Sequence, residues 1–302
     1  MKNKRIEIPL GWKCNERCFF CSETELIEYH KGKSLSFEYF YKLLISYYKE
    51  GYNHLTIVGG EPTIEKNFMK AIKLAKKLGM GVQISTNGLR FEDEVFSKEA
   101  MKYIDRITLS VHTIEDDLFK KITQTNIDGW KSRLEKILKN IGKYKDNHEI
   151  RINYVLTNYN IEHLKILDTI NYIEKNLPNY TSFVLTYPDI TVIESGELTK
   201  KIKVKKDDLF SSLEILYEKL SSDQTRKLVL ADMPFCFVPE ELHGNLQDNF
   251  MALDSISKIF IKDEKKKHDR NKVDPRGRFK ANQCNNCKYS HTCFGFPNIF
   301  EF

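Results

Sequence analysis

Residues 54–88 read HLTIVGGEPTIEKNFMKAIKLAKKLGMGVQISTNG and contain one complete strand–helix–strand unit. The apolar run at 54–58 stops at a Gly-Gly pair, as a short buried strand does when a turn follows it. Residues 66–77 place apolar side chains near helical spacing, and a glycine closes that segment. A second strand at 82–86 ends at Asn-Gly. This order predicts parallel strands that are joined by a right-handed crossover.

The same alternation extends in both directions along the chain. Further strands are expected at 6–10, 106–111, 150–156 and 182–187, and helices near 37–49, 94–103, 130–143, 161–175 and 209–220. Residues 227–231 have the composition of one more strand. A closed eight-fold barrel usually needs ~250 residues, whereas this repeat fades near residue 220. The sequence therefore predicts an α/β fold: a partial, open (βα)6 TIM-like barrel over residues 1–225, then a small cysteine-rich domain over residues 226–302.

The composition is that of a folded protein. Of the 302 residues, 41% are hydrophobic and 30% are charged, which excludes a disordered chain. No run approaches the ~18 apolar residues of a membrane span, and the first residues lack the apolar stretch of a signal peptide. The net charge is only +6, and the charged run at 262–272 predicts a solvated loop. We therefore expect a cytoplasmic protein that binds neither a membrane nor a nucleic acid.

Seven cysteines fall into two groups, three after the first expected strand and four after residue 225: Cys14, Cys18, Cys21, Cys236, Cys284, Cys287 and Cys293. An odd number without an export signal argues against a disulfide framework, and such clusters usually bind metal in a reducing compartment. The first group lies where an α/β barrel assembles its active site. Three thiolates can hold three irons of a [4Fe–4S] cluster and leave one iron open, whereas three thiolates with His30 form the alternative zinc site.

The first group has the spacing Cys-x3-Cys-x2-Cys with aromatic Phe20 before its last cysteine, and it resembles the signature of the radical S-adenosylmethionine (radical SAM) enzymes. Further matches follow in the order of that family, at successive strand ends. Gly59-Gly60-Glu61-Pro62 is similar to the family's GGEP motif, and Ser85-Thr86-Asn87-Gly88 follows the next strand. Ser110 and Arg151 lie on the fourth and fifth strands, where the family carries polar and basic side chains.

The resemblance implies a role for each match. The first three cysteines hold a [4Fe–4S] cluster whose open iron binds S-adenosylmethionine (SAM). Gly59 and Gly60 let the backbone approach a ligand, and Glu61 accepts a hydrogen bond from the methionine amine. Arg151 makes a charge-assisted contact with the carboxylate. The implied SAM-binding residues are Gly59, Gly60, Glu61, Thr86, Asn87, Ser110 and Arg151.

The other four cysteines make a complete coordination shell. Together with Cys236, the Cys-x2-Cys-x5-Cys spacing from Cys284 to Cys293 resembles the C-terminal SPASM or twitch domain, which holds an auxiliary [4Fe–4S] cluster. Four cysteines are enough for one such cluster, which fits the shorter, twitch-like version. A zinc ribbon built from the same four cysteines is the alternative, because zinc and iron–sulfur ligands overlap in spacing.

The resemblance implies an enzyme that reductively cleaves SAM to a 5′-deoxyadenosyl radical, which abstracts a hydrogen atom from a substrate. The electron comes from a donor such as flavodoxin or ferredoxin. Three plus four ligands use all seven thiols, so no cysteine is left to return a hydrogen atom. We therefore expect a net oxidation, a cross-link or a dehydrogenation, of a peptide or protein. A small-molecule metabolite is the alternative substrate, and a non-catalytic, zinc-stabilised nucleic-acid-binding protein is the alternative of another class.

Overall fold

A nine-stranded sheet forms the centre of the computed structural model, which describes residues 4–30, 32–144, 148–188, 202–247, 256–259, 280–293 and 295–296. The strand order is β8-β7-β6-β5-β4-β3-β2-β1-β9, and every pairing is parallel. Among the described residues no pairing joins β8 to β9, so the sheet is open. The strands are β1 Lys4–Pro9, β2 His54–Val58, β3 Gly81–Thr86, β4 Arg106–Ser110, β5 Glu149–Val155, β6 Ser182–Thr186, β7 Leu228–Ala231, β8 Leu246–Gln247 and β9 Ile256–Ile259.

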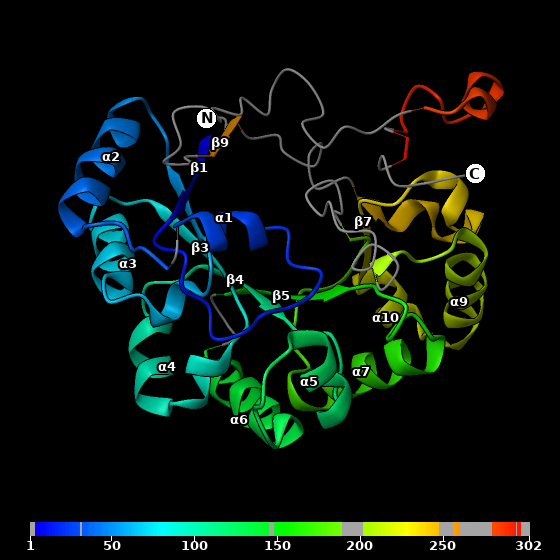
Figure 1. The fold of residues 1–302 in the computed structure, drawn as a ribbon, viewed down its shortest axis with the longest axis horizontal. Helices are drawn as coiled ribbons and strands as arrows, with labels where there is room; N and C mark the ends of the chain where they lie inside the picture. The colour runs from blue at the N-terminus through cyan, green and yellow to red at the C-terminus, as the bar shows by residue number, and fades with distance from the viewer. Residues whose placement is uncertain are drawn as a thin grey trace.

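Helices follow the strands and lie along the outside of the curved sheet, as α2, α3, α4, α6 and α7 show in Figure 1. Ser36 caps α2 by accepting a hydrogen bond from the Tyr39 N–H, which satisfies one free donor of the first turn. The helices are α1 Thr24–His30, α2 Phe37–Lys49, α3 Phe68–Lys77, α4 Glu94–Met101, α5 Asp116–Thr123, α6 Trp130–Gly142, α7 His163–Asn176, α9 Lys206–Lys219 and α10 Ser222–Lys227.

Alternation along the strands gives the sheet one dry face and one polar face. Every second side chain of the central strands is fully buried in the core that the helices complete, among them Ile6, Ile8, Ile84, Ile107 and Ile152. The positions between them are polar and partly exposed, among them Glu7, Gln83, Arg106, Glu149 and Arg151. Parallel sheets are usually apolar on both faces. The side chains on the polar face of this sheet therefore do not form part of the hydrophobic core.

The expected open α/β barrel is confirmed, with the six strands of the expected repeat and the further strand expected at 227–231 in one parallel sheet. The sheet is wider than the six-unit repeat, because β7 follows β6 and because β8 and β9 extend its two edges. Strand β9 has four residues, too few for alternation to distinguish a strand from a loop. Helices α1, α5 and α10 were not predicted either, and none of them is longer than eight residues.

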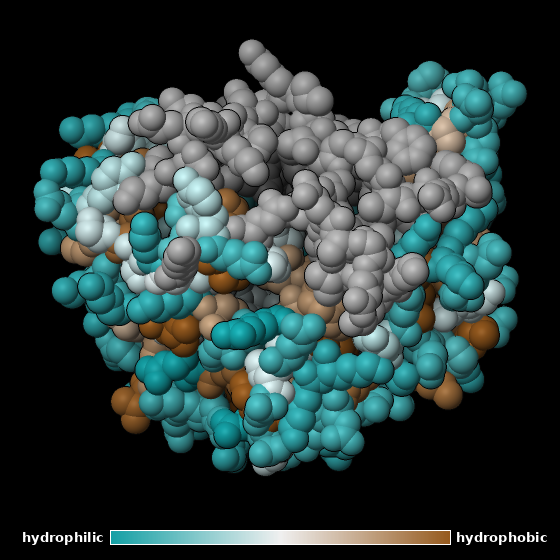
Figure 2. Space-filling model, in the orientation of Figure 1, coloured by the Kyte–Doolittle hydropathy of each residue, from teal (hydrophilic) through white to brown (hydrophobic). Residues whose placement is uncertain are grey.

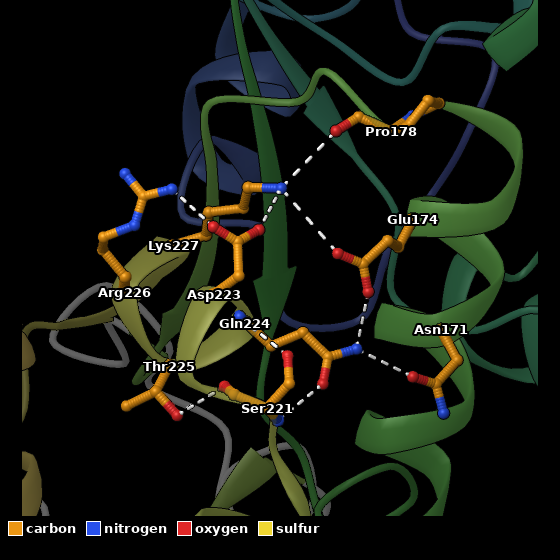
Figure 3. Close-up of polar contacts among 9 residues, drawn as sticks. All are labelled: Asn171, Glu174, Pro178, Ser221, Asp223, Gln224, Thr225, Arg226 and Lys227. Atoms are coloured by element: carbon orange, nitrogen blue, oxygen red, sulfur yellow. Dashed lines mark hydrogen bonds and ion pairs between the residues drawn. The ribbon is translucent and has the colours of Figure 1, made fainter.

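The predicted domain boundary at residue 225 lies inside helix α10. Gln224 forms a capping box with Ser221, and its amide donates to Asn171 Oδ1 (2.9 Å) and Glu174 Oε2 (2.7 Å) of α7 (Figure 3). The chain then enters β7, which pairs with β6. The barrel sheet therefore continues past residue 225, and a separate domain over residues 226–302 stays a prediction.

Among the residues that are coloured in Figure 2, most are hydrophilic, and hydrophobic residues are scattered between them. Within the described ranges, each helix falls short of the length and apolar character that a bilayer crossing needs. The charged run at 262–272, for which we predicted a solvated loop, lies outside the described residues.

Candidate functional site

The three cysteines of the first group lie in the loop that follows β1. The Arg17 N–H donates to Thr123 O (2.8 Å) and thereby ties this loop to the end of α5. The Cys21 N–H donates to Cys18 O (3.0 Å) and closes a tight turn between the last two cysteines. The loop is therefore held at the carboxyl end of the first strand, which is where a parallel α/β barrel assembles its active site.

The three thiols are partly buried and influence one another's ionisation. Burial is the main cause that raises their pKa values, to about 12 for Cys14 and well above the usual value for Cys18, and neighbouring negative groups add to it. The Cys18 thiol donates to Glu16 Oε2 (3.2 Å), a carboxylate whose pKa burial raises to about 7. Thiolates are costly in this loop unless cations replace their protons, as the irons of a cluster do.

Glu61 joins the turn after β2 to the end of β3. Its carboxylate is 2% exposed. Oxygen Oε1 accepts hydrogen bonds from the Thr63 N–H (3.0 Å), the Thr63 hydroxyl (2.5 Å) and the Thr86 hydroxyl (2.7 Å). Among the described residues, oxygen Oε2 accepts only from the Asn87 N–H (2.7 Å). Burial raises the pKa of Glu61 and these donors counteract the rise, while Oε2 retains capacity for a further donor.

The two glycines before Glu61 contact the cysteine loop. A Cβ on Gly59 would lie 2.3 Å from Gly11 O, and a Cβ on Gly60 would lie 2.1 Å from Lys13 O. The Gly60 N–H donates to Gly11 O (3.0 Å), and the Glu61 N–H donates to Lys13 O (2.6 Å). Sequence analysis predicted that these glycines admit a ligand. The close approach that the structure shows is to the backbone of the cysteine loop, so this loop and the turn are one unit.

Asn87 completes the connection between the motifs. Its side-chain Nδ2 donates to Asn15 Oδ1 (2.7 Å) in the cysteine loop, while its backbone N–H donates to Glu61. Sequence analysis missed Asn15, although its place directly after Cys14 was a signal. The structure thus brings the cysteine loop, the GGEP turn and the end of β3 together at the carboxyl ends of neighbouring strands.

Ser110 and Arg151 lie on neighbouring strands but at different levels. In the parallel pairing of β4 with β5, Ser110 is level with Asn153, and Arg151 is level with Thr108. Two residues of a strand span about 6–7 Å. Arg151 therefore leaves the sheet about that far below the carboxyl end at which Ser110 lies, and Asn153 is the register neighbour of Ser110.

His112 follows β4 and packs beside the cysteine motif. Its ring lies edge to face with Phe20, with 4.8 Å between the centroids. Its Nδ1 accepts a hydrogen bond from the Val155 N–H (3.1 Å), so the proton of the neutral ring is on Nε2. Burial lowers the pKa of His112 to about 3, which keeps the ring neutral at pH 7. The neutral ring forms part of the wall around the cysteine loop.

The other four cysteines lie beyond β7. Cys236 is exposed in the 3-10 helix η4 (Phe235–Phe237), and Cys284 lies in η6 (Asn282–Asn286). Partial burial raises the pKa of Cys236 to about 11. The Cys287 N–H donates to Cys284 O (3.2 Å). The second group therefore comes from two segments of the chain.

An aromatic contact holds those two segments together. Tyr289 stacks on Phe235 with ring centroids 4.5 Å apart. His243 Nε2 lies 3.1 Å from Phe235 O and 3.0 Å from Val238 O, and because carbonyls only accept, Nε2 carries the proton. The Tyr289 hydroxyl then donates to His243 Nδ1 (3.0 Å). This contact fixes the segment that carries Cys284, Cys287 and Cys293 beside Cys236.

Within the described ranges, no three His, Cys, Asp or Glu side chains converge on one point that a single metal ion could occupy. Three and four cysteine thiols are donor sets that suit iron–sulfur clusters and zinc sites alike.

An open parallel barrel with a three-cysteine loop after its first strand defines a class of iron–sulfur enzymes. The model of the radical SAM superfamily matches residues 8–173, which is more than half of the chain. The chain belongs to the radical SAM superfamily.

Known proteins resemble the chain in part. GTP 3′,8-cyclase of Clostridium perfringens is 30% identical over 178 residues, 57% of this chain and 52% of that protein. Probable GTP 3′,8-cyclase of Thermococcus kodakarensis is 30% identical over 132 residues, 44% of this chain and 42% of that protein. The match thus spans about half the length of these curated relatives. Streptococcus suis SuiB bound to precursor peptide SuiA shares the fold, with a TM-score of 0.62 at 16% identity over 95% of this chain and 70% of SuiB.

Proposed function

We propose that this radical SAM protein cleaves SAM reductively and uses the 5′-deoxyadenosyl radical for a net oxidative modification, a cross-link or a dehydrogenation, of a peptide or protein. A bound [4Fe–4S] cluster supplies the electron and an open iron for SAM. The observation that carries the proposal is the pair of hydrogen bonds from Asn87 to Glu61 and to Asn15 (both 2.7 Å), because it joins three motifs at one site.

Different residues of this site bind the cluster and SAM. Cys14, Cys18 and Cys21 hold three irons. Glu61 Oε2 accepts an N–H of the SAM amine, since it has one donor in the structure and capacity for another. The remaining residues of the proposed SAM site are Gly59, Gly60, Thr86, Asn87, Ser110 and Arg151.

The second cysteine group gives the reaction its oxidative direction in this proposal. Cys236, Cys284, Cys287 and Cys293 hold an auxiliary cluster, whose chemistry is electron transfer. All seven thiols are then ligands, so none is free to return a hydrogen atom to the substrate radical. An external ferredoxin or flavodoxin supplies the electron for the first cluster.

Two observations bear on the substrate. SuiB, whose structure contains a precursor peptide, matches the fold over 95% of this chain and supports a peptide substrate. The 30% identity to GTP 3′,8-cyclase supports a second candidate, a small molecule such as a nucleotide.

Anaerobic reconstitution with iron and sulfide tests the first step. The wild-type protein should be brown, should contain about eight irons per chain, ~4 for each cluster, and should form 5′-deoxyadenosine from SAM and dithionite. The variant with Cys14, Cys18 and Cys21 replaced by Ala should retain about four irons and form no 5′-deoxyadenosine. Colourless protein with stoichiometric zinc contradicts the proposal.

Product masses then test the oxidative step and the substrate. A peptide product that is two hydrogens lighter supports the oxidative modification of a peptide. Consumption of GTP with formation of 5′-deoxyadenosine supports the nucleotide alternative. A product of unchanged mass rules out the oxidative version.

A further inference from the structure

We propose that His112 is a further SAM-binding residue, whose Nε2–H donates a hydrogen bond to an uncharged acceptor at the nucleoside end of SAM, a ring nitrogen of adenine or a ribose oxygen. The inference deepens the proposed function and rests on it in one respect, since it takes the end of β3 as the place where the SAM amine binds.

The first observation is that the ring of His112 is held in one orientation. Its Nδ1 accepts a hydrogen bond from the Val155 N–H (3.1 Å), and the ring lies edge to face with Phe20, 4.8 Å between the centroids. The backbone is fixed as well, because Asn160 Nδ2 donates to His112 O (3.0 Å). His112 is 7% exposed. The ring is therefore ordered before a ligand binds, which lowers the entropy cost of a contact with it.

The second observation is that Nε2 carries a proton for which the described residues provide no acceptor. Since Nδ1 accepts, the hydrogen of the neutral ring is on Nε2. Among the described residues, Nε2 has no hydrogen-bond partner. Polar atoms that are fully enclosed without a partner occur elsewhere, such as Thr56 Oγ1 and Tyr180 Oη, but Nε2 is not one of them. Part of its surface is therefore open to a ligand, whose acceptor would remove the cost of an unpaired donor.

The third observation is the position of His112 relative to Glu61. Glu61 Oε2, the proposed acceptor for the SAM amine, is bonded to the Asn87 N–H at the end of β3. His112 follows β4 and is bonded to Val155, the last residue of β5. Neighbouring strands lie ~4.8 Å apart, so roughly 5–10 Å separate the two places. The amine and the nucleoside are opposite ends of SAM, and the cysteine loop occupies the side of β1 and β2. The nucleoside therefore extends toward β4 and β5.

The fourth observation is that the ring is uncharged. Burial lowers the pKa of His112 to about 3, so the ring is neutral at pH 7. SAM carries a positive charge on its sulfonium, which an imidazolium beside it would repel. The acceptor atoms of adenine and ribose are uncharged, so a neutral donor matches them.

Two substitutions separate the roles of the two ring nitrogens. His112→Asn retains an acceptor near the place of Nδ1 and lacks a donor at the place of Nε2, whereas His112→Gln puts an amide nitrogen near Nε2. We expect His112→Asn to weaken the binding of SAM by about 3–10-fold, the range for one neutral hydrogen bond. We expect His112→Gln to restore most of this affinity. A purely structural role predicts the reverse order, because Asn can still accept from the Val155 N–H.

Calorimetric titrations of the anaerobically reconstituted protein with SAM and with 5′-deoxyadenosine provide the measurement. 5′-Deoxyadenosine keeps the nucleoside and lacks the methionine, so both affinities should fall by the same factor in His112→Asn. His163→Asn is the matched control, because it makes the same substitution at the start of α7, on the outer side of the sheet (Figure 1). It should change both affinities by less than about two-fold.

The wild-type protein provides a second measurement that does not depend on the folding of a variant. After labelling with ¹⁵N-histidine, the signal of one neutral ring with its proton on Nε2 should shift when 5′-deoxyadenosine is added. Absence of such a shift overturns the inference even if a variant does not retain its iron.

Three further results would overturn the inference. An affinity of His112→Asn equal to that of the wild type means that Nε2 has no acceptor on the nucleoside. Weaker binding of SAM with unchanged binding of 5′-deoxyadenosine places His112 at the methionine end. An altered visible spectrum before SAM is added, with unchanged SAM affinity, means that Nε2 donates to the cluster instead. Formation of 5′-deoxyadenosine from SAM is measured separately, so its absence from a wild type that binds SAM counts against the proposed function alone.

Discussion

Gly60 shows at the scale of one residue why the GGEP turn tolerates no side chain there. Lys13 O occupies the position that a Cβ would need, and the hydrogen bond from the Glu61 N–H to the same oxygen prevents Lys13 from moving away easily. Any larger residue at position 60 must therefore displace the loop that carries the first three cysteines.

We predict that Gly60→Ala lowers the iron content by up to about four irons per chain, the content of one cluster, because the added Cβ would lie 2.1 Å from Lys13 O. Gly244→Ala is the control, since a Cβ there meets no atom within 4 Å. Iron and sulfide assays after anaerobic reconstitution provide the measurement. Full iron content in Gly60→Ala would show that the loop adapts.

The sequence predicted which polar residues belong to the site, but it did not predict their hydrogen-bond partners. Sequence analysis placed Glu61, Thr86 and Asn87 near a ligand, and the structure shows that they first bond to one another. A sequence does not reveal whether a buried polar group is satisfied by a ligand or by a neighbour, since both satisfy it equally. Arg151 illustrates the same limit, because its depth depends on strand register, which the strand pattern alone does not give.

At the scale of the element, helix α10 is stabilised mainly by one side chain, that of Gln224. It has six residues, too few for independent stability, and Gln224 both closes its capping box and bonds to α7. Figure 3 shows these contacts, together with the ion pair of Lys227 with Asp223.

We predict that Gln224→Ala lowers the free energy of unfolding by about 1–3 kcal/mol, because it leaves buried polar groups of the cap and of α7 without partners. Thr225→Ala, one residue further on, removes an exposed hydrogen bond to Ser221 O and should change it by less than about 0.5 kcal/mol. Urea unfolding followed by circular dichroism compares the two variants. Equal effects would mean that the junction with α7 contributes nothing.

The elements that the sequence predicted were those with local signals. Helix α2 begins after its cap Ser36, near the start that was predicted for it, and β2 and β3 end where Gly59 and Asn87 follow. Strand β9 was missed because its stability comes from a distant partner, since it pairs with β1. Patterns within a short window do not record such contacts.

The two cysteine groups are separated at the scale of the whole molecule. One follows β1, the other lies beyond β7, and strands β2 to β6 lie between β1 and β7 in the sheet. Different elements support the two groups. The turn after β2 contacts the loop of the first group, and the stacked pair of Tyr289 and Phe235 joins the segments of the second.

We therefore predict that replacing Cys284 and Cys287 by Ala halves the iron content to about four per chain and preserves the formation of 5′-deoxyadenosine from SAM without substrate. Iron assays and chromatography of the nucleoside measure both effects. Conversion of substrate should be lost in this variant if the second cluster accepts the electron. Loss of both sites together would show that the two groups fold as one unit.

The pairing of β9 with β1 has a consequence for synthesis of the chain on the ribosome. Residues Lys4–Glu7 meet Ile256–Ile259, which emerge about 250 residues later. At roughly 5–20 residues per second, β1 waits more than about ten seconds for this neighbour, and until then its outer N–H and C=O groups remain open to strands of other chains. Nascent chains that are halted before residue 256 expose the unpaired edge of β1. At high expression levels we therefore expect chaperones to bind these chains at their first strand.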